Sequence, residues 1–255
     1  MKLPAPLSLP NLGKLVLNFS TPRQKSDVEP LLPLWAAFSG LLVFSGYLLY
    51  QKGVWASLLS ADPTYLTALI VVLFIGTTIW VGFRANTLTR QHQKLLEFER
   101  LAQTNADQAR NWLNQLPESW AQELFKGLQN KESHWRDNGQ LIQLLAEKAS
   151  APHEMAWWLN GVLLKLGLLG KVIGFSIMAL QLGAMDSFDS GQTSAVLKTL
   201  TGGLGIALLT TMTGLTANIL LGIQLMRLDR FADHLTAKAI KVAEIDLQNI
   251  MDRPQ

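Results

Sequence analysis

Four long stretches of this chain carry almost no charge, and they constrain the fold more than any other feature. They span residues 31–50, 66–83, 166–182 and 204–226, and Lys171 is the only Asp, Glu, Lys, Arg or His among them. About 20 apolar residues in a helix cross the hydrocarbon layer of a bilayer, which is about 30 Å thick. The sequence therefore predicts an all-α polytopic membrane protein with four transmembrane helices and helical cytoplasmic extensions.

The composition excludes several classes of site. The chain has no cysteine, so disulfides, thiolate metal sites and cysteine nucleophiles are ruled out. Its four histidines lack ligand spacing, and Gly170-Lys171-Val172 lacks the first glycine and the Ser/Thr of a phosphate-binding loop. We therefore expect no enzyme, no catalytic residue, no metal and no cofactor.

The basic residues indicate how the chain is oriented. Eighteen lysines and arginines lie in residues 1–30, 84–155 and 227–255, whereas the short loops 51–65 and 183–201 hold one each. Loops rich in Lys and Arg stay in the cytoplasm. The pattern predicts that both termini lie in the cytoplasm, with the bilayer around the four spans, and we expect no nucleic-acid partner.

Five segments follow from this topology. Residues 1–30 form a cytoplasmic N-terminal segment, in which 9–17 is either an interfacial helix or an unstructured lead-in. Residues 31–83 hold the first two spans and a short periplasmic loop, and 84–155 form a cytoplasmic helical region. Residues 156–227 are a core with spans three and four, and 228–255 are a cytoplasmic C-terminal helix.

Apolar spacing describes the cytoplasmic part further. Leu88, Leu95 and Phe98 recur at helical spacing, which predicts that the second span continues as an amphipathic stalk. The tail is also amphipathic and is expected to pack on this stalk. A proline at 117 breaks the stalk, a further helical stretch is expected around 120–129, and Pro152 marks the approach to the third span.

Lys171 is the most informative polar residue. A lysine in the middle of a span costs roughly 2.5–3.5 kcal/mol on insertion scales, so a compensating partner is expected. Lys165 lies nearer the cytoplasmic end and can extend to the interface.

Small and polar residues form one stripe on each of the last two spans. On the third span Gly167, Lys171 and Gly174 follow steps of four and three, and on the fourth the stripe is Ala207, Thr211, Gly214 and Asn218. Such stripes suit an ion pathway or a groove for a partner helix. Helix packing is the alternative, because small residues let membrane helices approach closely.

Two motifs in these spans resemble a known family. Residues 166–175 (LGLLGKVIGF) resemble the glycine-rich third span of the MotA/TolQ/ExbB proton-channel family, and residues 207–218 (ALLTTMTGLTAN) are similar to its last span. The resemblance covers roughly residues 157–227, and the four-span topology is MotA-like. It implies that Thr211 corresponds to the pore threonine of the last span. Lys171 takes the place of the threonine of the third span.

The resemblance also implies partners and a function. It implies a homo-oligomer, a pentamer, around the helices of a single-span MotB/TolR/ExbD-like protein that carries an intramembrane aspartate. The expected function is an ion-driven motor or energy-transducing subunit in the bacterial inner membrane. Coupling to a flagellar rotor, force transfer through a periplasmic partner as in the TonB and Tol systems, and the role of a specialised relative are the alternatives for the driven process. The alternatives are a non-conducting scaffold that clamps a partner helix and a small-solute transporter. The candidate residues for the ion pathway or partner-helix face are Thr211, Lys171, Asn218, Gly174, Gly214 and Thr210.

Lys171 bears on which ion is carried. An ammonium repels a sodium ion, and like charges about 4 Å apart cost several kcal/mol in a partly shielded site. We therefore expect a proton as the ion, with Lys171 paired to the partner's carboxylate. Alternatively, Lys171 closes the complex as a plug.

Overall fold

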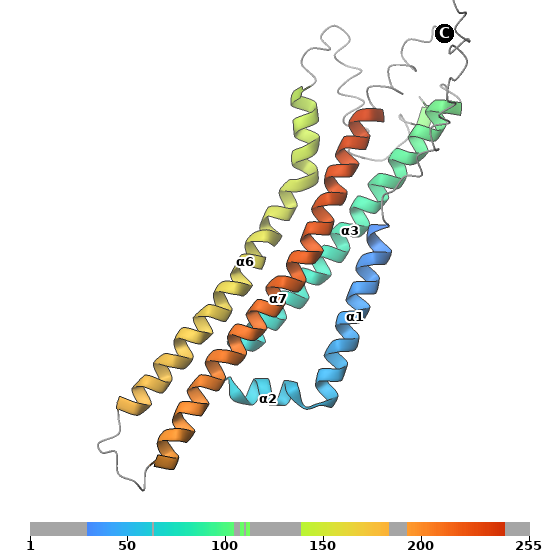
Figure 1. Ribbon diagram of the computed structural model, residues 1–255. Coiled ribbons are helices and arrows are strands. Elements are labelled where there is room, and N and C mark those ends of the chain that lie inside the picture. Colours follow the sequence, from blue (N-terminus) through green and yellow to red (C-terminus); the bar gives the residue numbers. More distant parts are fainter. Residues whose placement is uncertain are drawn as a thin grey trace, which may run out of the picture.

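The computed structural model is a bundle of long helices (Figure 1). It describes residues 30–62, 64–104, 108, 109, 111, 112, 139–183 and 193–242. The elements are α1 (Leu31–Gln51), α2 (Val54–Ala61), α3 (Leu66–Thr104), α6 (Gly139–Gly183) and α7 (Thr193–Val242), and no strand occurs in these ranges. The expected helices at 9–17 and 120–129 and the tail beyond Val242 lie outside the described residues.

Four of the helices are long and apolar enough to cross a membrane, which confirms the predicted fold class at this level. α3, α6 and α7 have 39, 45 and 50 residues. At about 1.5 Å per residue they are about 58, 68 and 75 Å long, roughly twice the thickness of a hydrocarbon core. Each long helix therefore has to extend beyond any bilayer that it crosses.

The expected segment boundaries are not marked by helix ends. The boundaries expected at 83/84, 155/156 and 227/228 all fall inside continuous helices. Pro152, expected to mark the approach to the third span, lies inside α6. The expected short loop 51–65 contains α2, which is joined to α1 through a turn in which Gly53 has φ +68°. Glycine adopts this left-handed conformation without a steric cost.

The start of α3 is capped by the side chain of Asp62. The Asp62 carboxylate accepts hydrogen bonds from the backbone N–H of Thr64 at 2.9 Å and of Thr67 at 2.6 Å. These bonds satisfy amide groups that have no partner within the helix. Asp62, four residues before Leu66, thus fixes where α3 begins.

The stalk has its own apolar core. Leu88, Leu95 and Phe98 of α3 are fully buried, and they belong to one cluster with Leu228 and Leu235 of α7. An ion pair between Lys238 and Glu99, with Nζ and Oε2 3.0 Å apart, joins the same two helices. The predicted packing of the tail on the stalk is confirmed as far as Val242.

The other half of the bundle exposes apolar side chains. α1 buries only Leu31, and Val43, Val72 and Leu180 are 74%, 65% and 75% exposed. Such a surface is stable in lipid or against other protein chains, not in water. The chain is therefore described as a multi-pass membrane protein.

Candidate functional site

The α6–α7 contact contains most of the residues that the sequence singled out. Gly167 and Gly214 meet backbone to backbone: a Cβ added to Gly214 would lie 2.8 Å from the Gly167 Cα and 2.9 Å from the carbonyl oxygen of Leu163. Contacts this short leave no room for a side chain. We call this contact the glycine seam, defined by Gly167, Gly170 and Gly174 of α6 with Gly203, Thr210 and Gly214 of α7.

The seam continues towards the C-terminal end of α6 and the N-terminal end of α7. Gly170 faces the side chain of Thr210, whose Cβ would lie 2.5 Å from an added methyl group. Gly174 packs against α7 so closely that an added Cβ would lie 2.8 Å from the Ala207 amide nitrogen and 3.0 Å from the Gly203 carbonyl oxygen. The two helices thus touch along about three turns.

Thr210 of the seam and its neighbour Thr211 both bond to backbone carbonyls. The Thr211 hydroxyl lies 2.7 Å from the Ala207 carbonyl oxygen in its own helix and 3.2 Å from the Gly167 carbonyl oxygen across the seam. The Thr210 hydroxyl donates to the carbonyl of Ile206 and is fully buried. Both hydroxyls therefore act as helix-packing groups in this chain.

Amide side chains lie beyond Gly214 of α7, towards the C-terminal end of that helix. The Asn218 side-chain amide donates to the backbone carbonyl of Asn160 at 2.8 Å. The Gln224 amide donates to the Thr78 hydroxyl at 3.3 Å, which connects α7 to α3. Buried polar groups with partners hold apolar helices in one register.

Lys171 does not join the seam. It follows Gly170 by one residue, so its side chain is turned by about 100° from that of Gly170. It is exposed, and its ammonium lies 5.9 Å from the centre of the Phe175 ring in the same helix. The expected stripe is thus divided: Gly167 and Gly174 face α7, whereas Lys171 faces outward.

The six candidate residues therefore form two groups. Gly174, Gly214, Thr210, Thr211 and Asn218 contact the partner helix of the same chain, and Lys171 lies on the free surface of the helix pair. Within the described ranges, no group of three His, Cys, Asp or Glu residues could hold a metal ion.

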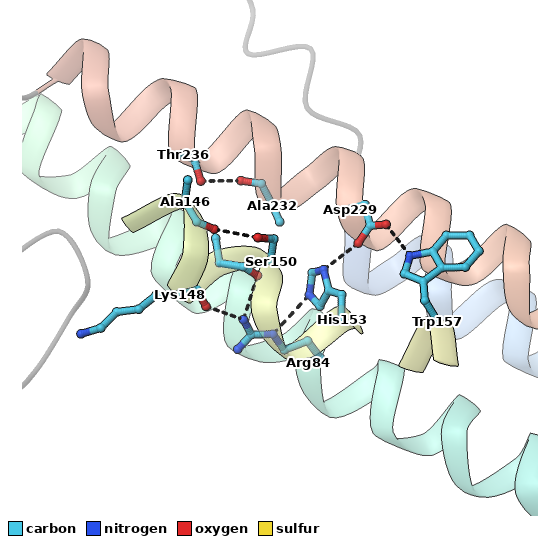
Figure 2. A network of polar contacts seen from close by, with 10 residues as sticks. Arg84, Ala146, Lys148, Ser150, His153, Trp157, Asp229, Ala232 and Thr236 are labelled. Atoms are coloured by element: carbon cyan, nitrogen blue, oxygen red, sulfur yellow. Dashed lines mark hydrogen bonds and ion pairs between the residues drawn. The ribbon is translucent and has the colours of Figure 1, made fainter. Parts of the chain in front are cut away.

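A polar network that the sequence did not indicate joins α3, α6 and α7 (Figure 2). His153 lies at its centre, with Nδ1 2.7 Å from Oδ1 of Asp229 and Nε2 3.3 Å from Nε of Arg84. The indole N–H of Trp157 donates to the other oxygen of Asp229 at 2.7 Å. We call these four residues the junction.

The junction requires one tautomer of His153. Arg84 can only donate, so Nε2 has to accept and carries no proton. Nδ1 then carries the proton and donates to Asp229, and the ring is neutral. Because the ring is desolvated, its pKa lies below the usual value, although Asp229 opposes this shift and Arg84 adds to it.

Arg84 also supplies a hydrogen-bond donor that α6 lacks because of Pro152. Proline has no N–H, so the carbonyl four residues earlier, that of Lys148, loses its helical donor. The Arg84 guanidinium donates to this carbonyl at 3.1 Å and to the carbonyl of Ala149 at 3.0 Å. α6 changes direction in its first part (Figure 1), as expected for a helix that contains a proline.

One signal in the sequence could have indicated the junction. Arg84 directly follows the second apolar run, and Asp229 follows the fourth by three residues. Both runs are expected to end on the same side of the membrane, which would place these opposite charges at similar depth.

Comparison of the chain with protein-family models, with curated proteins and with solved structures finds no match. The geometry of the glycine seam, the junction and Lys171 is therefore what supports a function.

Proposed function

We propose that this chain is the multi-span subunit of an ion-driven, energy-transducing complex of the MotA/TolQ/ExbB kind, located in the bacterial inner membrane. Several copies, five in the resembling family, surround the membrane helix of a single-span partner. The partner contributes the aspartate that takes up and releases a proton.

One observation carries this proposal. Lys171 is exposed on the apolar surface of α6, in a chain whose four expected spans contain no carboxylate. An ammonium in lipid is costly without a compensating charge. A carboxylate on another chain supplies that charge, and the same carboxylate is the proton carrier that this chain lacks.

The glycine seam supports the proposal in a second way. It holds α6 and α7 together as one rigid pair, so Lys171 is presented at a defined position. A ring of such pairs would place one Lys171 per copy around a central helix.

The composition of the purified complex tests this proposal. Full-length tagged protein is extracted from its own cells in mild detergent and studied by native mass spectrometry. We expect several copies together with a small single-span protein that has an aspartate in its span. The Lys171→Met variant should lose that protein, whereas the matched Lys165→Met variant should keep it. A monomer, or a homo-oligomer that never holds a second chain, would refute the proposal.

Flux measurements test the ion. In vesicles that contain the complex, we expect partner-dependent proton flux that does not depend on sodium concentration. Strict sodium dependence would contradict the pairing of Lys171 with the partner's carboxylate.

A non-conducting scaffold is the second candidate, and the hydrogen bonds of the seam favour it. The Thr211 hydroxyl and the Asn218 amide both reach backbone carbonyls of α6, as in a packed interface between helices. If Lys171 closes such a scaffold, the Lys171→Thr variant should make vesicles leaky to protons. Unchanged permeability would count against the plug.

A further inference from the structure

A cavity of about 430 Å³ lies between α1, α3 and α7. Leu34, Trp35 and Phe38 of α1 form one wall, and Val81 of α3 and Ile223 of α7 lie opposite. The size is within the range of small-molecule sites in proteins. The cavity is separate from both the glycine seam and the junction.

Its α7 wall is basic. Arg227, Arg230 and His234 all line the cavity, and their spacing of three and four residues puts them on one face of the helix. The α1 wall is apolar. It consists of four residues that also share one face of their helix: Leu31, Leu34, Trp35 and Phe38. The cavity therefore suits a molecule with an anionic end and an apolar end.

The depth of the cavity agrees with this chemistry. The first expected span starts at residue 31, the second ends at 83 and the fourth ends at 226, and the cavity lies where these three ends meet. Arg227 and Arg230 are then at the level of the lipid headgroups on the cytoplasmic side. Trp35 and Phe38 lie one to two turns deeper, among the acyl chains.

Among the described residues, two buried polar atoms in the wall have no hydrogen-bond partner. The side-chain oxygen of Gln224, a residue only 6% exposed, accepts no hydrogen bond, and the indole N–H of Trp35 donates none. Both residues line the cavity. Buried polar groups are nearly always satisfied, so these atoms indicate a bound molecule with its own donors and acceptors.

We propose that this cavity binds an anionic phospholipid of the cytoplasmic leaflet. Its phosphate lies between Arg227 and Arg230, its glycerol and ester groups lie near Gln224 and Trp35, and one acyl chain follows the apolar face of α1. Basic pockets between membrane helices on this side bind such headgroups. The inference rests on the membrane orientation and is independent of the ion-driven function.

Lipid retention tests the proposal. The purified full-length protein is mixed with equal amounts of phosphatidylglycerol and phosphatidylcholine of matched chains, and retained lipid is counted by native mass spectrometry. We expect about a tenfold preference for phosphatidylglycerol, lost in the Arg227→Gln/Arg230→Gln double variant. A matched variant, Arg90→Gln/Arg100→Gln, removes two exposed arginines of α3 that do not line the cavity and should keep the preference.

Further arms separate the sources of the phosphate and control for folding. Inorganic phosphate in large excess should not displace the lipid, because it cannot occupy the apolar wall; displacement would show a phosphate site instead. The charge-conserving Arg227→Lys/Arg230→Lys variant should keep most of the preference. Equal retention of the two lipids by the wild-type protein would overturn the proposal, even if the glutamine variant fails to fold.

Discussion

At the residue scale, His153 joins the three long helices as a neutral ring. Protonation would place an N–H opposite the Arg84 guanidinium, from which Nε2 accepts at 3.3 Å. A second buried histidine, His92, also has a pKa below its usual value, because burial and the charge of Lys238 oppose its protonation. Both rings lie outside the expected spans.

The sign of the pH dependence follows. An unfolded chain takes up a proton on each ring at about pH 6.5, whereas the folded chain resists protonation. Above about pH 6.5 the two rings are neutral in both states and do not lower the free energy of unfolding. Below that pH only the unfolded chain takes up the protons readily, so the free energy of unfolding decreases. We expect the thermal midpoint in detergent to fall between about pH 7.5 and 5.5.

Substitution identifies the contribution of His153. The His153→Asn variant can still donate to Asp229 but does not titrate, so its midpoint should fall less over the same pH interval. The His92→Asn variant removes the other buried ring and should reduce the fall in the same way. An unchanged pH dependence in His153→Asn would show that this ring does not contribute.

A second prediction at this scale concerns the contribution of Arg84 to stability. Arg84→Met should lower the free energy of unfolding, because the carbonyls near Pro152 lose their donor. In a Pro152→Ala background the helix regains its own N–H, so the cost of Arg84→Met should be smaller by about 0.5–1.5 kcal/mol. Thermal or denaturant unfolding of the four proteins gives this coupling, and equal costs in both backgrounds would contradict the repair of the helix by Arg84.

At the element scale, the glycine seam makes α6 and α7 a single unit. Gly214→Ala should destabilise the chain by about 1–3 kcal/mol, because the new methyl group would meet the Gly167 backbone. Gly205→Ala, in the same helix but with open space around it, should instead be neutral or add up to about 1 kcal/mol. Thermal unfolding in detergent compares the two. A Gly214→Ala protein as stable as Gly205→Ala would refute close packing at the seam.

α1 is held by a similar fit. A Cβ at Gly82 of α3 would overlap the Trp35 ring, so this glycine admits the indole of α1. The same ring forms part of the wall of the lipid cavity. A Gly82→Ala variant should therefore lose the phosphatidylglycerol preference even though both arginines remain, and native mass spectrometry would show this. Full retention of the preference would contradict the fit.

The sequence predicted these elements well but not their ends. Apolar runs predict the spans because a helix that crosses lipid needs about 20 consecutive apolar residues. The helical spacing of Leu88, Leu95 and Phe98 predicted the stalk. Where a span continues into a stalk the backbone pattern does not change, so the ends of α3, α6 and α7 were not visible. The continuation of α6 through Pro152 could not be read from the local sequence. The donor that replaces the missing N–H belongs to Arg84, 68 residues earlier in the chain.

Helical spacing predicted the glycines of the α6–α7 contact but not the separate position of Lys171. Steps of three and four place Gly167, Lys171 and Gly174 roughly on one face, but a face is wider than the line of contact between two helices. Only atoms at the contact line have to be small, and Lys171 lies beside it. The junction was missed because its residues come from three helices and have no common spacing.

At the scale of the whole molecule, the absence of cysteine allows the topology to be mapped directly. A single cysteine replacing exposed Ser57 in α2 should react with a membrane-impermeant maleimide in intact spheroplasts. A cysteine replacing exposed Lys241 near the end of α7 should react only after the membrane is permeabilised. The reverse pattern would invert the orientation, and with it the leaflet of the lipid cavity.

The continuity of α6 has a mechanical consequence. If a helix of about 68 Å tilts by about 5° as one body, its two ends shift relative to each other by about 6 Å. The bend at Pro152 and the contact with Arg84 lie between the glycine seam and the N-terminal end of α6. A tilt that starts near Lys171 therefore reaches the N-terminal end of α6 only to the extent that the helix stays rigid at Pro152.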